Sequence, residues 1–155
     1  MGPVIPRALV ARALFVPEDS LPEADLPMER FAQRHRVFLS DAARDIAEPP
    51  EVWTSDVMFL LTREEPTLAL AAIRATLALC ETPGEVGLLA AGCLEDLLAE
   101  HGPSVIRPLA EDADARMLYA LTGVWRNAIP PMVWAQVEAL RAGVPGLDVG
   151  APLPP

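Results

Sequence analysis

Apolar residues recur every three to four positions along most of this chain, and prolines separate the segments that carry the repeat. That spacing places apolar side chains on one face of a helix, and prolines begin or end helices because they lack a backbone N–H donor. Two of the predicted helices contain a disruptive proline, Pro6 and Pro108. The predicted helices cover residues 4–16, 27–47, 50–64, 66–80, 83–101, 104–111, 114–126 and 131–142.

The apolar residues of four of these segments form stripes that should face a common core. They are Met28, Phe31, Phe38, Leu39, Ala42 and Ile46; Trp53, Val57, Leu60 and Leu61; Met117, Leu118, Leu121, Val124 and Trp125; and Val133, Trp134, Val137 and Leu140. The segment 66–80 is apolar almost all round, which is typical of a helix covered on several sides. The three tryptophans fit a core role at this spacing, whereas an exposed one would be a candidate binding hot spot.

The helix over 83–101 has a boundary signal at each end. Thr82 and Glu85 have the spacing of a capping box, in which each side chain accepts a hydrogen bond from the backbone of the other residue. Gly102 suits the left-handed position that follows a helix end, and Pro103 cannot continue the helix. These residues predict where the helix begins and ends.

The same helix contains a glycine in its middle and two adjacent carboxylates just after it. Gly92 costs about 1 kcal/mol relative to alanine, so we expect it to mark a tight crossing with another helix. On a helical projection Glu95 points outward and Asp96 lies near the edge of the apolar face. Three interpretations stay open: both carboxylates are solvated, Asp96 forms a partly buried pair with Arg107 or Arg126, or both belong to a binding surface.

No segment alternates between apolar and polar residues, so the sequence predicts an all-α protein without strands. Because short connections favour antiparallel neighbours, we expect six or seven antiparallel helices in a compact bundle or a short stack of α-hairpins. The chain divides into an N-terminal helix with an acidic, proline-rich linker at 1–27, a helical domain at 28–142, and a flexible tail rich in proline and glycine at 143–155.

Charge and hydropathy limit the partners and the location. The chain has 22 acidic and 12 basic residues, a net charge of −10, and no lysine. An acidic chain repels phosphate backbones, so we expect no direct nucleic-acid binding and an attraction to basic proteins. No stretch reaches the roughly 18 apolar residues of a membrane span, and Arg12 interrupts the apolar segment that a signal peptide would need. We therefore expect a soluble, cytoplasmic protein.

The residues that usually bind metals or act in catalysis are few and scattered. His35 fits a core or boundary position, and His101 lies at a predicted helix C-terminus, where the helix dipole favours its charged form. Cys80 and Cys93 fit buried thiols in a reducing compartment. None of these residues has the spacing of a metal site or a redox motif, and we expect no metal and no cofactor.

Two segments carry a resemblance to a known family: LLAAGCLEDLLAEHGPSVI and ALTGVWRNAIPPMVWAQVEALR. They resemble a bacterial family of small helical proteins of unknown function with an L-A-A-G-x-L-E-D-L-L-x-x-H-G motif and a later G-V-W and V-W-x-x-V-x-x-L segment. The matching residues are 89–102, 123–125 and 131–140, within a resemblance over residues 50–142. Cys93 replaces a proline of the pattern, and Pro108 interrupts a smoother helix. The resemblance implies a helical fold and a bacterial source, but no activity.

A small acidic helical protein without a catalytic motif is best interpreted as a non-enzymatic protein–protein interaction module. A sharper form is an immunity or inhibitor protein whose negative surface covers a basic partner, and self-association is another option. The candidate partner-binding residues are Glu95, Asp96, Glu100, Trp125 and Arg126. Two alternatives remain: an enzyme with a cryptic site near Glu95, Asp96, His101 and Arg126, and a regulator that mimics DNA with rows of carboxylates.

Overall fold

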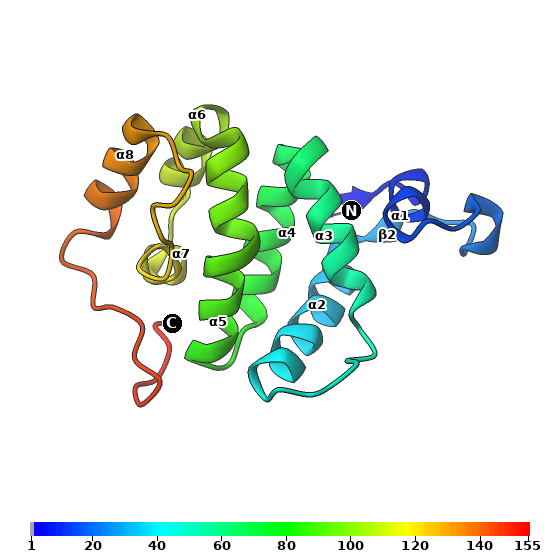
Figure 1. Cartoon of the computed structure of the whole chain (residues 1–155), viewed down its shortest axis with the longest axis horizontal. Helices are drawn as coiled ribbons and strands as arrows, with labels where there is room; N and C mark the ends of the chain where they lie inside the picture. The colour runs from blue at the N-terminus through cyan, green and yellow to red at the C-terminus, as the bar shows by residue number, and fades with distance from the viewer. Residues whose placement is uncertain (1) are drawn as a thin grey trace.

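The computed structural model describes residues 2–155 and is mostly helical (Figure 1). Its helices are α1 (Arg7–Leu14), α2 (Met28–Ala43), α3 (Trp53–Glu64), α4 (Pro66–Leu79), α5 (Pro83–Leu89), α6 (Glu95–Glu111), α7 (Ala115–Leu121) and α8 (Pro131–Arg141), with a π-helical turn, η2 (Ala90–Leu94), between α5 and α6. Figure 1 shows these elements following one another along the long axis, from α1 at one end to α8 at the other. The all-α class is therefore correct apart from one small β-ladder.

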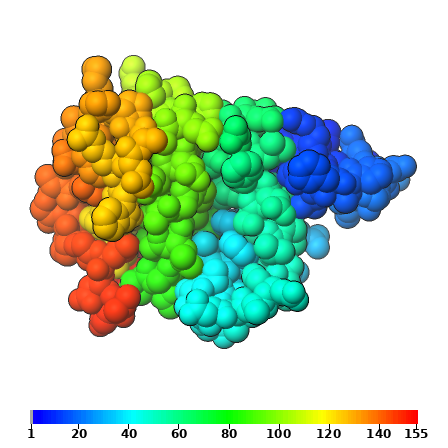
Figure 2. All heavy atoms as spheres, viewed as in Figure 1, coloured from blue at the N-terminus to red at the C-terminus, as the bar shows by residue number. Residues whose placement is uncertain are grey.

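That ladder lies near the N-terminus, where the prediction of no strands is wrong. β1 (Val4–Ile5) and β2 (Leu26–Pro27) pair antiparallel, with Val4 opposite Pro27. Two residues per strand are too few to show a period-two pattern in the sequence. The ladder closes a loop that holds α1 and the 3-10 turn η1 (Glu18–Ser20), and this N-terminal part projects from the body (Figure 2).

α4 occupies the centre of the core, as its almost uniformly apolar sequence predicts. It packs against α2, α3, α6 and α7. Pro66 begins the helix in its first turn, where a backbone N–H has no partner within the helix. The buried residues of α4 are Ala69, Leu70, Ala72, Ile73, Thr76 and Leu77.

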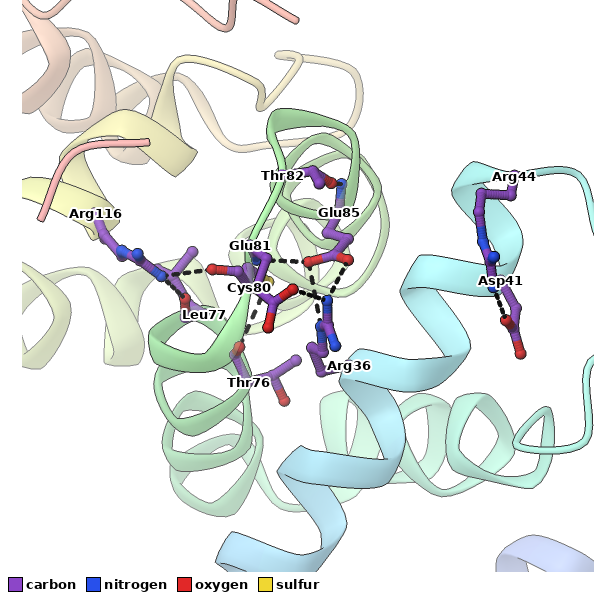
Figure 3. Close-up of polar contacts among 10 residues, drawn as sticks. All are labelled: Arg36, Asp41, Arg44, Thr76, Leu77, Cys80, Glu81, Thr82, Glu85 and Arg116. Carbon is purple, nitrogen blue, oxygen red and sulfur yellow. Dashed lines mark hydrogen bonds and ion pairs between the residues drawn. The ribbon is translucent and has the colours of Figure 1, made fainter. Parts of the chain in front are cut away.

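An ion pair between a buried carboxylate and a partly exposed arginine joins α2 to the start of α5 (Figure 3). Thr82 accepts a hydrogen bond from the backbone N–H of Glu85 at 3.2 Å, as the capping box predicts. The Glu85 carboxylate accepts from the backbone N–H of Glu81 at 2.6 Å rather than from Thr82, and it is only 1% exposed. Arg36 donates to Glu85 at 3.0 Å and to Glu81 at 2.7 Å. Because a buried carboxylate needs such partners, this ion pair fixes how α2 and α5 approach each other.

At His101, where the predicted helix ends, the backbone leaves the helical region with φ −130° and ψ 17°, so α6 is kinked there before it continues to Glu111. The separate helix predicted over 104–111 is the part of α6 that follows this kink. Gly102 is buried directly after this kink and does not adopt the left-handed conformation predicted for it. A Cβ built on Gly102 would lie 2.8 Å from both γ-carbons of Val133, so the absence of a side chain allows α8 to pack closely on α6.

The helix predicted over 27–47 ends at Ala43, and Ile46, which was expected to face the core, is 44% exposed. Asp45 and Glu48 adopt φ of +55° and +53°, so the chain turns here instead of continuing the helix. The apolar spacing extends past the true helix end because Ile46 falls by chance in register with the stripe.

The tail that follows α8 lies against the body in the structure. Gly143 adopts φ +77°, the conformation expected of a glycine that ends this helix. Leu147 packs against Gly123: a Cβ built on Gly123 would lie 2.6 Å from a δ-carbon of Leu147. Arg116 donates to the carbonyl of Pro154 at 3.0 Å. The flexibility of residues 143–155 stays a prediction.

Candidate functional site

A buried carboxylate, Glu95, holds the loop that follows α7. Glu95 is only 8% exposed, so the expectation that it points outward is wrong. Its Oε2 accepts the backbone N–H of Trp125 at 3.0 Å, and its Oε1 accepts a hydrogen bond from the side-chain amide of Asn127. Both carboxylate oxygens are therefore satisfied by one distant loop, and Glu95 acts as a positioning group rather than as a surface charge.

Trp125 presents its indole to solvent from this loop and is 70% exposed. α7 ends at Leu121, so the core role expected for Trp125 as the last residue of a helical stripe is wrong. The backbone N–H of Ile129 donates to the carbonyl of Arg126 at 2.8 Å, which closes a turn. Asn127 adopts φ +33°, a conformation that asparagine tolerates better than most residues. The loop thus combines a fixed backbone with an exposed aromatic side chain.

The π-helical turn η2 directly precedes Glu95 and explains its orientation. Gly92 has φ −101° and ψ −108°, outside the helical region. A Cβ built on Gly92 would contact nothing within 4 Å, so the tight helix crossing expected at this glycine is wrong. A π-turn contains one residue more than an α-turn, which rotates the following side chains by about 100° relative to a straight helix. Glu95 thereby turns toward the loop.

A pocket of about 190 Å³ lies beside η2, between α2, α3 and α5. Phe38, Phe59 and Leu88 supply apolar walls, and the last two are 58% and 41% exposed. Asp96 lines the pocket from the first turn of α6. Because successive helical residues point about 100° apart, Glu95 contacts the loop while Asp96 lines this pocket.

His35 contributes to the same pocket and is 3% exposed, consistent with a core or boundary position. Its ring stacks on Phe31 and Phe38, with centroid distances of 5.5 Å and 5.7 Å. Nδ1 lies 2.9 Å from the hydroxyl of Thr54, which itself donates to the carbonyl of Glu51 at 2.7 Å. Thr54 therefore accepts from Nδ1–H and leaves Nε2 as an acceptor. Burial lowers the pKa of His35 to about 4, so the ring is neutral at pH 7.

Asp96 is exposed and forms neither of the ion pairs expected with Arg107 or Arg126, so that interpretation is wrong. Arg107 pairs instead with a glutamate of its own helix. Within residues 2–155, Asp96 and Glu100 have no ion-pair partner. Partial burial and the charges of Glu95 and Glu100 raise the pKa of Asp96. The first turns of α6 therefore present uncompensated negative charge.

The four side chains considered for a cryptic catalytic site have separate contacts. Glu95 holds the loop, and Nε2 of His101 donates to the carbonyl of Arg63 at 2.9 Å. Arg126 is exposed beside Trp125. Of the four, the pocket beside η2 contains Asp96 alone.

The two thiols have the character of neutral, structural groups. Burial, with the charge of Asp96, raises the pKa of Cys93 to about 12, and the thiol donates to the carbonyl of Leu89 at 3.6 Å. Burial, with the charge of Glu85, raises the pKa of Cys80 to about 12. Across residues 2–155, no group of three or more histidine, cysteine or acidic residues is arranged to hold a metal ion. In the same range, no helix combines the length and apolar character needed to cross a bilayer.

Sequence reasoning missed several residues of this region. Phe59 lies outside the stripe of Trp53, Val57, Leu60 and Leu61, and such an off-stripe aromatic residue is itself a signal of exposure. Asn127 follows an apolar run, and asparagine favours turns with left-handed backbone. Leu88 falls toward the apolar side of the predicted helix, so its exposed fraction of 41% was not expected.

A family of unknown function (DUF6869) matches residues 41–144, from the end of α2 through α8. The match covers more than half of the chain, and the chain belongs to this family. No curated protein and no solved structure matches the chain significantly. The resemblance noted in the sequence is thus supported at the level of a family of unknown function, while its detailed motif and the bacterial source stay predictions.

Proposed function

We propose that this member of a family without an assigned activity is a non-enzymatic protein-binding module, with a contact surface centred on Trp125. The exposed indole carries the proposal. Tryptophan is enriched among the few interface residues that supply most of the binding free energy. An indole that is 70% exposed in the free protein has most of its apolar surface still to bury against a partner.

The fixed backbone of the loop supports this role. Glu95 holds the chain on both sides of Arg126, through the backbone of Trp125 and the side chain of Asn127. A contact residue held in place before the partner arrives loses less conformational entropy on binding. In this proposal Glu95 positions the surface, while Trp125 and Arg126 touch the partner.

Charge supports a basic partner. The chain carries a net charge of −10, and Asp96 and Glu100 lie one turn apart on α6 without ion-pair partners among residues 2–155. Complementary charge speeds association and favours one class of partner over another. An inhibitor of the immunity type, which covers a basic surface of its target, is the sharper form of the proposal.

Photo-cross-linking tests whether a partner contacts the surface around Trp125. A photoreactive phenylalanine analogue replaces Trp125 in one preparation and Phe15 in a second, and each protein is irradiated in an extract of its own cells. Phe15 is a matched control because it is an aromatic residue that is 96% exposed, and it directly follows α1, at the other end of the molecule (Figure 1). Mass spectrometry identifies the products.

We expect a reproducible basic protein to cross-link at position 125 and not at position 15. Its capture should fall as ionic strength rises, since salt screens the attraction between opposite charges. Purified partner should then bind Trp125→Ala more weakly by 2 kcal/mol or more, the order of about 2 kcal/mol that defines a hot spot. Equal cross-linking at both positions, or cross-linking only to copies of this chain, would refute the proposal.

A further inference from the structure

The pocket beside η2 combines apolar walls, an unsatisfied acceptor and a carboxylate at its edge. Phe38, Phe59 and Leu88 form the walls, and Asp96 approaches from α6. An apolar cavity of about 150 Å³ is large enough to hold benzene. The pocket of about 190 Å³ therefore has room for one aromatic ring.

Nε2 of His35 is the unsatisfied acceptor. Thr54 fixes the proton on Nδ1, and Nε2 has no hydrogen-bond partner within residues 2–155. His35 lines the pocket. Because Thr54 occupies Nδ1, Nε2 is the ring nitrogen left to accept a hydrogen bond from a group in the pocket.

Resting on the proposed function, we propose that this pocket receives the phenol ring of a tyrosine from the basic partner, next to an arginine that Asp96 binds. The ring would cover Phe38 and Phe59, and its O–H would donate to Nε2 of His35. The guanidinium would pair with the otherwise unpaired carboxylate of Asp96. The partner motif is therefore an exposed tyrosine adjacent to arginine.

The chemistry of the pocket favours tyrosine over other side chains. Phenylalanine would fill the space but leave Nε2 of His35 without a donor, and serine would supply a donor but leave the apolar walls uncovered. An acidic neighbour would be repelled by Asp96. Tyrosine and arginine are both enriched at protein interfaces, where they anchor in such pockets.

The test uses the full chain, labelled with ¹⁵N in the histidine rings, and the peptide N-acetyl-Tyr-Arg amide as the probe. NMR follows the ring nitrogens of His35 during the titration, and those of His101 serve as an internal control because that ring lies outside the pocket. We expect saturable shifts at His35 and none at His101. The measurement uses the native sequence, so it does not depend on a variant that fails to fold.

Matched peptides separate the two contacts. N-acetyl-Phe-Arg amide should bind about 3- to 10-fold more weakly than the tyrosine peptide, the loss expected for one hydrogen bond. N-acetyl-Tyr-Glu amide should bind more weakly than N-acetyl-Tyr-Arg amide, and Asp96→Asn should remove this difference while Glu100→Gln keeps it. Equal affinity for the tyrosine and phenylalanine peptides, or unchanged His35 signals, would overturn the inference.

Failure of this inference is distinguishable from failure of the proposed function. If a basic partner cross-links at position 125 but neither tyrosine peptide binds the pocket, the inference of a tyrosine pocket is refuted and the proposed function is not. Binding of N-acetyl-Tyr-Arg amide with the expected shifts at His35 supports the pocket even where the cross-linking at position 125 fails, and the surface around Trp125 is then the part that is wrong.

Discussion

The buried carboxylate of Glu95 accepts the backbone N–H of Trp125 at 3.0 Å and joins two segments that are 30 residues apart. Glu95→Ala leaves this N–H and the side-chain amide of Asn127 without their acceptor, and an unsatisfied buried group costs about 1–3 kcal/mol. We expect the free energy of unfolding to fall by about that amount and the amide of Trp125 to exchange faster. Denaturant titration and NMR hydrogen exchange measure these changes.

Glu100→Ala is the matched control, because Glu100 is an exposed glutamate on the same helix without an ion pair in the described part of the chain. It should change the free energy of unfolding by less than about 0.5 kcal/mol and leave the exchange of Trp125 unaltered. If Glu95→Ala also left that exchange unaltered, Glu95 would not be what holds the loop.

The contact between Gly102 and Val133 predicts that a single added methyl group destabilises the protein. Gly102→Ala places a Cβ 2.8 Å from two carbons of Val133, and overpacking of this kind costs about 1–3 kcal/mol. The cost exceeds the gain of about 1 kcal/mol that alanine brings inside a helix. We therefore expect a net loss of stability in thermal and chemical denaturation.

Val133→Ala supplies the control for this contact, because it removes both γ-carbons that the new methyl group would meet. In the Val133→Ala protein, Gly102→Ala should lower the free energy of unfolding by less than it does in the native protein. A double-mutant cycle measures the difference. An identical cost in the two backgrounds would mean that Val133 is not the cause.

Glu85 should be far more important for stability than its neighbour Glu81, although both pair with Arg36 (Figure 3). Glu85→Ala leaves the backbone N–H of Glu81 without its acceptor, although Arg36 keeps its pair with Glu81, and an unsatisfied buried group costs about 1–3 kcal/mol. Glu81 has a side chain that is 71% exposed, so Glu81→Ala should cost at most about 1 kcal/mol. Denaturant titration compares the two, and similar losses would contradict a special role for the buried carboxylate.

The features that the sequence predicted correctly depend on neighbouring residues. The predicted cap Thr82 accepts a hydrogen bond from the backbone of Glu85, three positions later in the chain, at 3.2 Å. Pro66 begins a helix for an equally local reason. Such signals require no knowledge of the rest of the fold, which is why these helix starts and the helical class were predictable.

The errors arise where a distant segment decides the local structure. The close helix crossing was expected at Gly92 but occurs at Gly102, because only the position of Val133 on α8 distinguishes the two glycines. Trp125 continues the spacing of the preceding stripe, yet the helix has already ended at Leu121. The chain then follows a loop that Glu95 holds from the other side.

The orientation of Glu95 was mispredicted for a different reason. A helical projection assumes a constant 100° step, whereas the π-turn around Gly92 inserts one residue and rotates everything after it. Glu95 consequently moves inward, and Asp96 moves to the pocket beside η2. Two adjacent carboxylates thus acquire different roles.

His35 should make the protein less stable as the pH falls from about 6.5 to about 4. Burial lowers the pKa of His35 in the folded protein from 6.5 to about 4, whereas the unfolded chain keeps a value near ~6.5. Between these values the unfolded state binds a proton that the folded state does not, so protonation favours unfolding. Once the pH is below both pKa values, this difference lowers the free energy of unfolding by about 3 kcal/mol relative to its value at neutral pH.

The variant His35→Gln isolates this effect, because glutamine stays neutral throughout the range and other groups titrate as before. The difference in unfolding free energy between the native protein and His35→Gln, measured by urea titration, should shift in favour of the variant as the pH decreases through this window. His101→Gln is the matched control and should keep the pH dependence that His35 produces. A difference between native protein and His35→Gln that stays constant from pH 7 down to about pH 4 would mean that His35 is not protonated more easily in the unfolded chain.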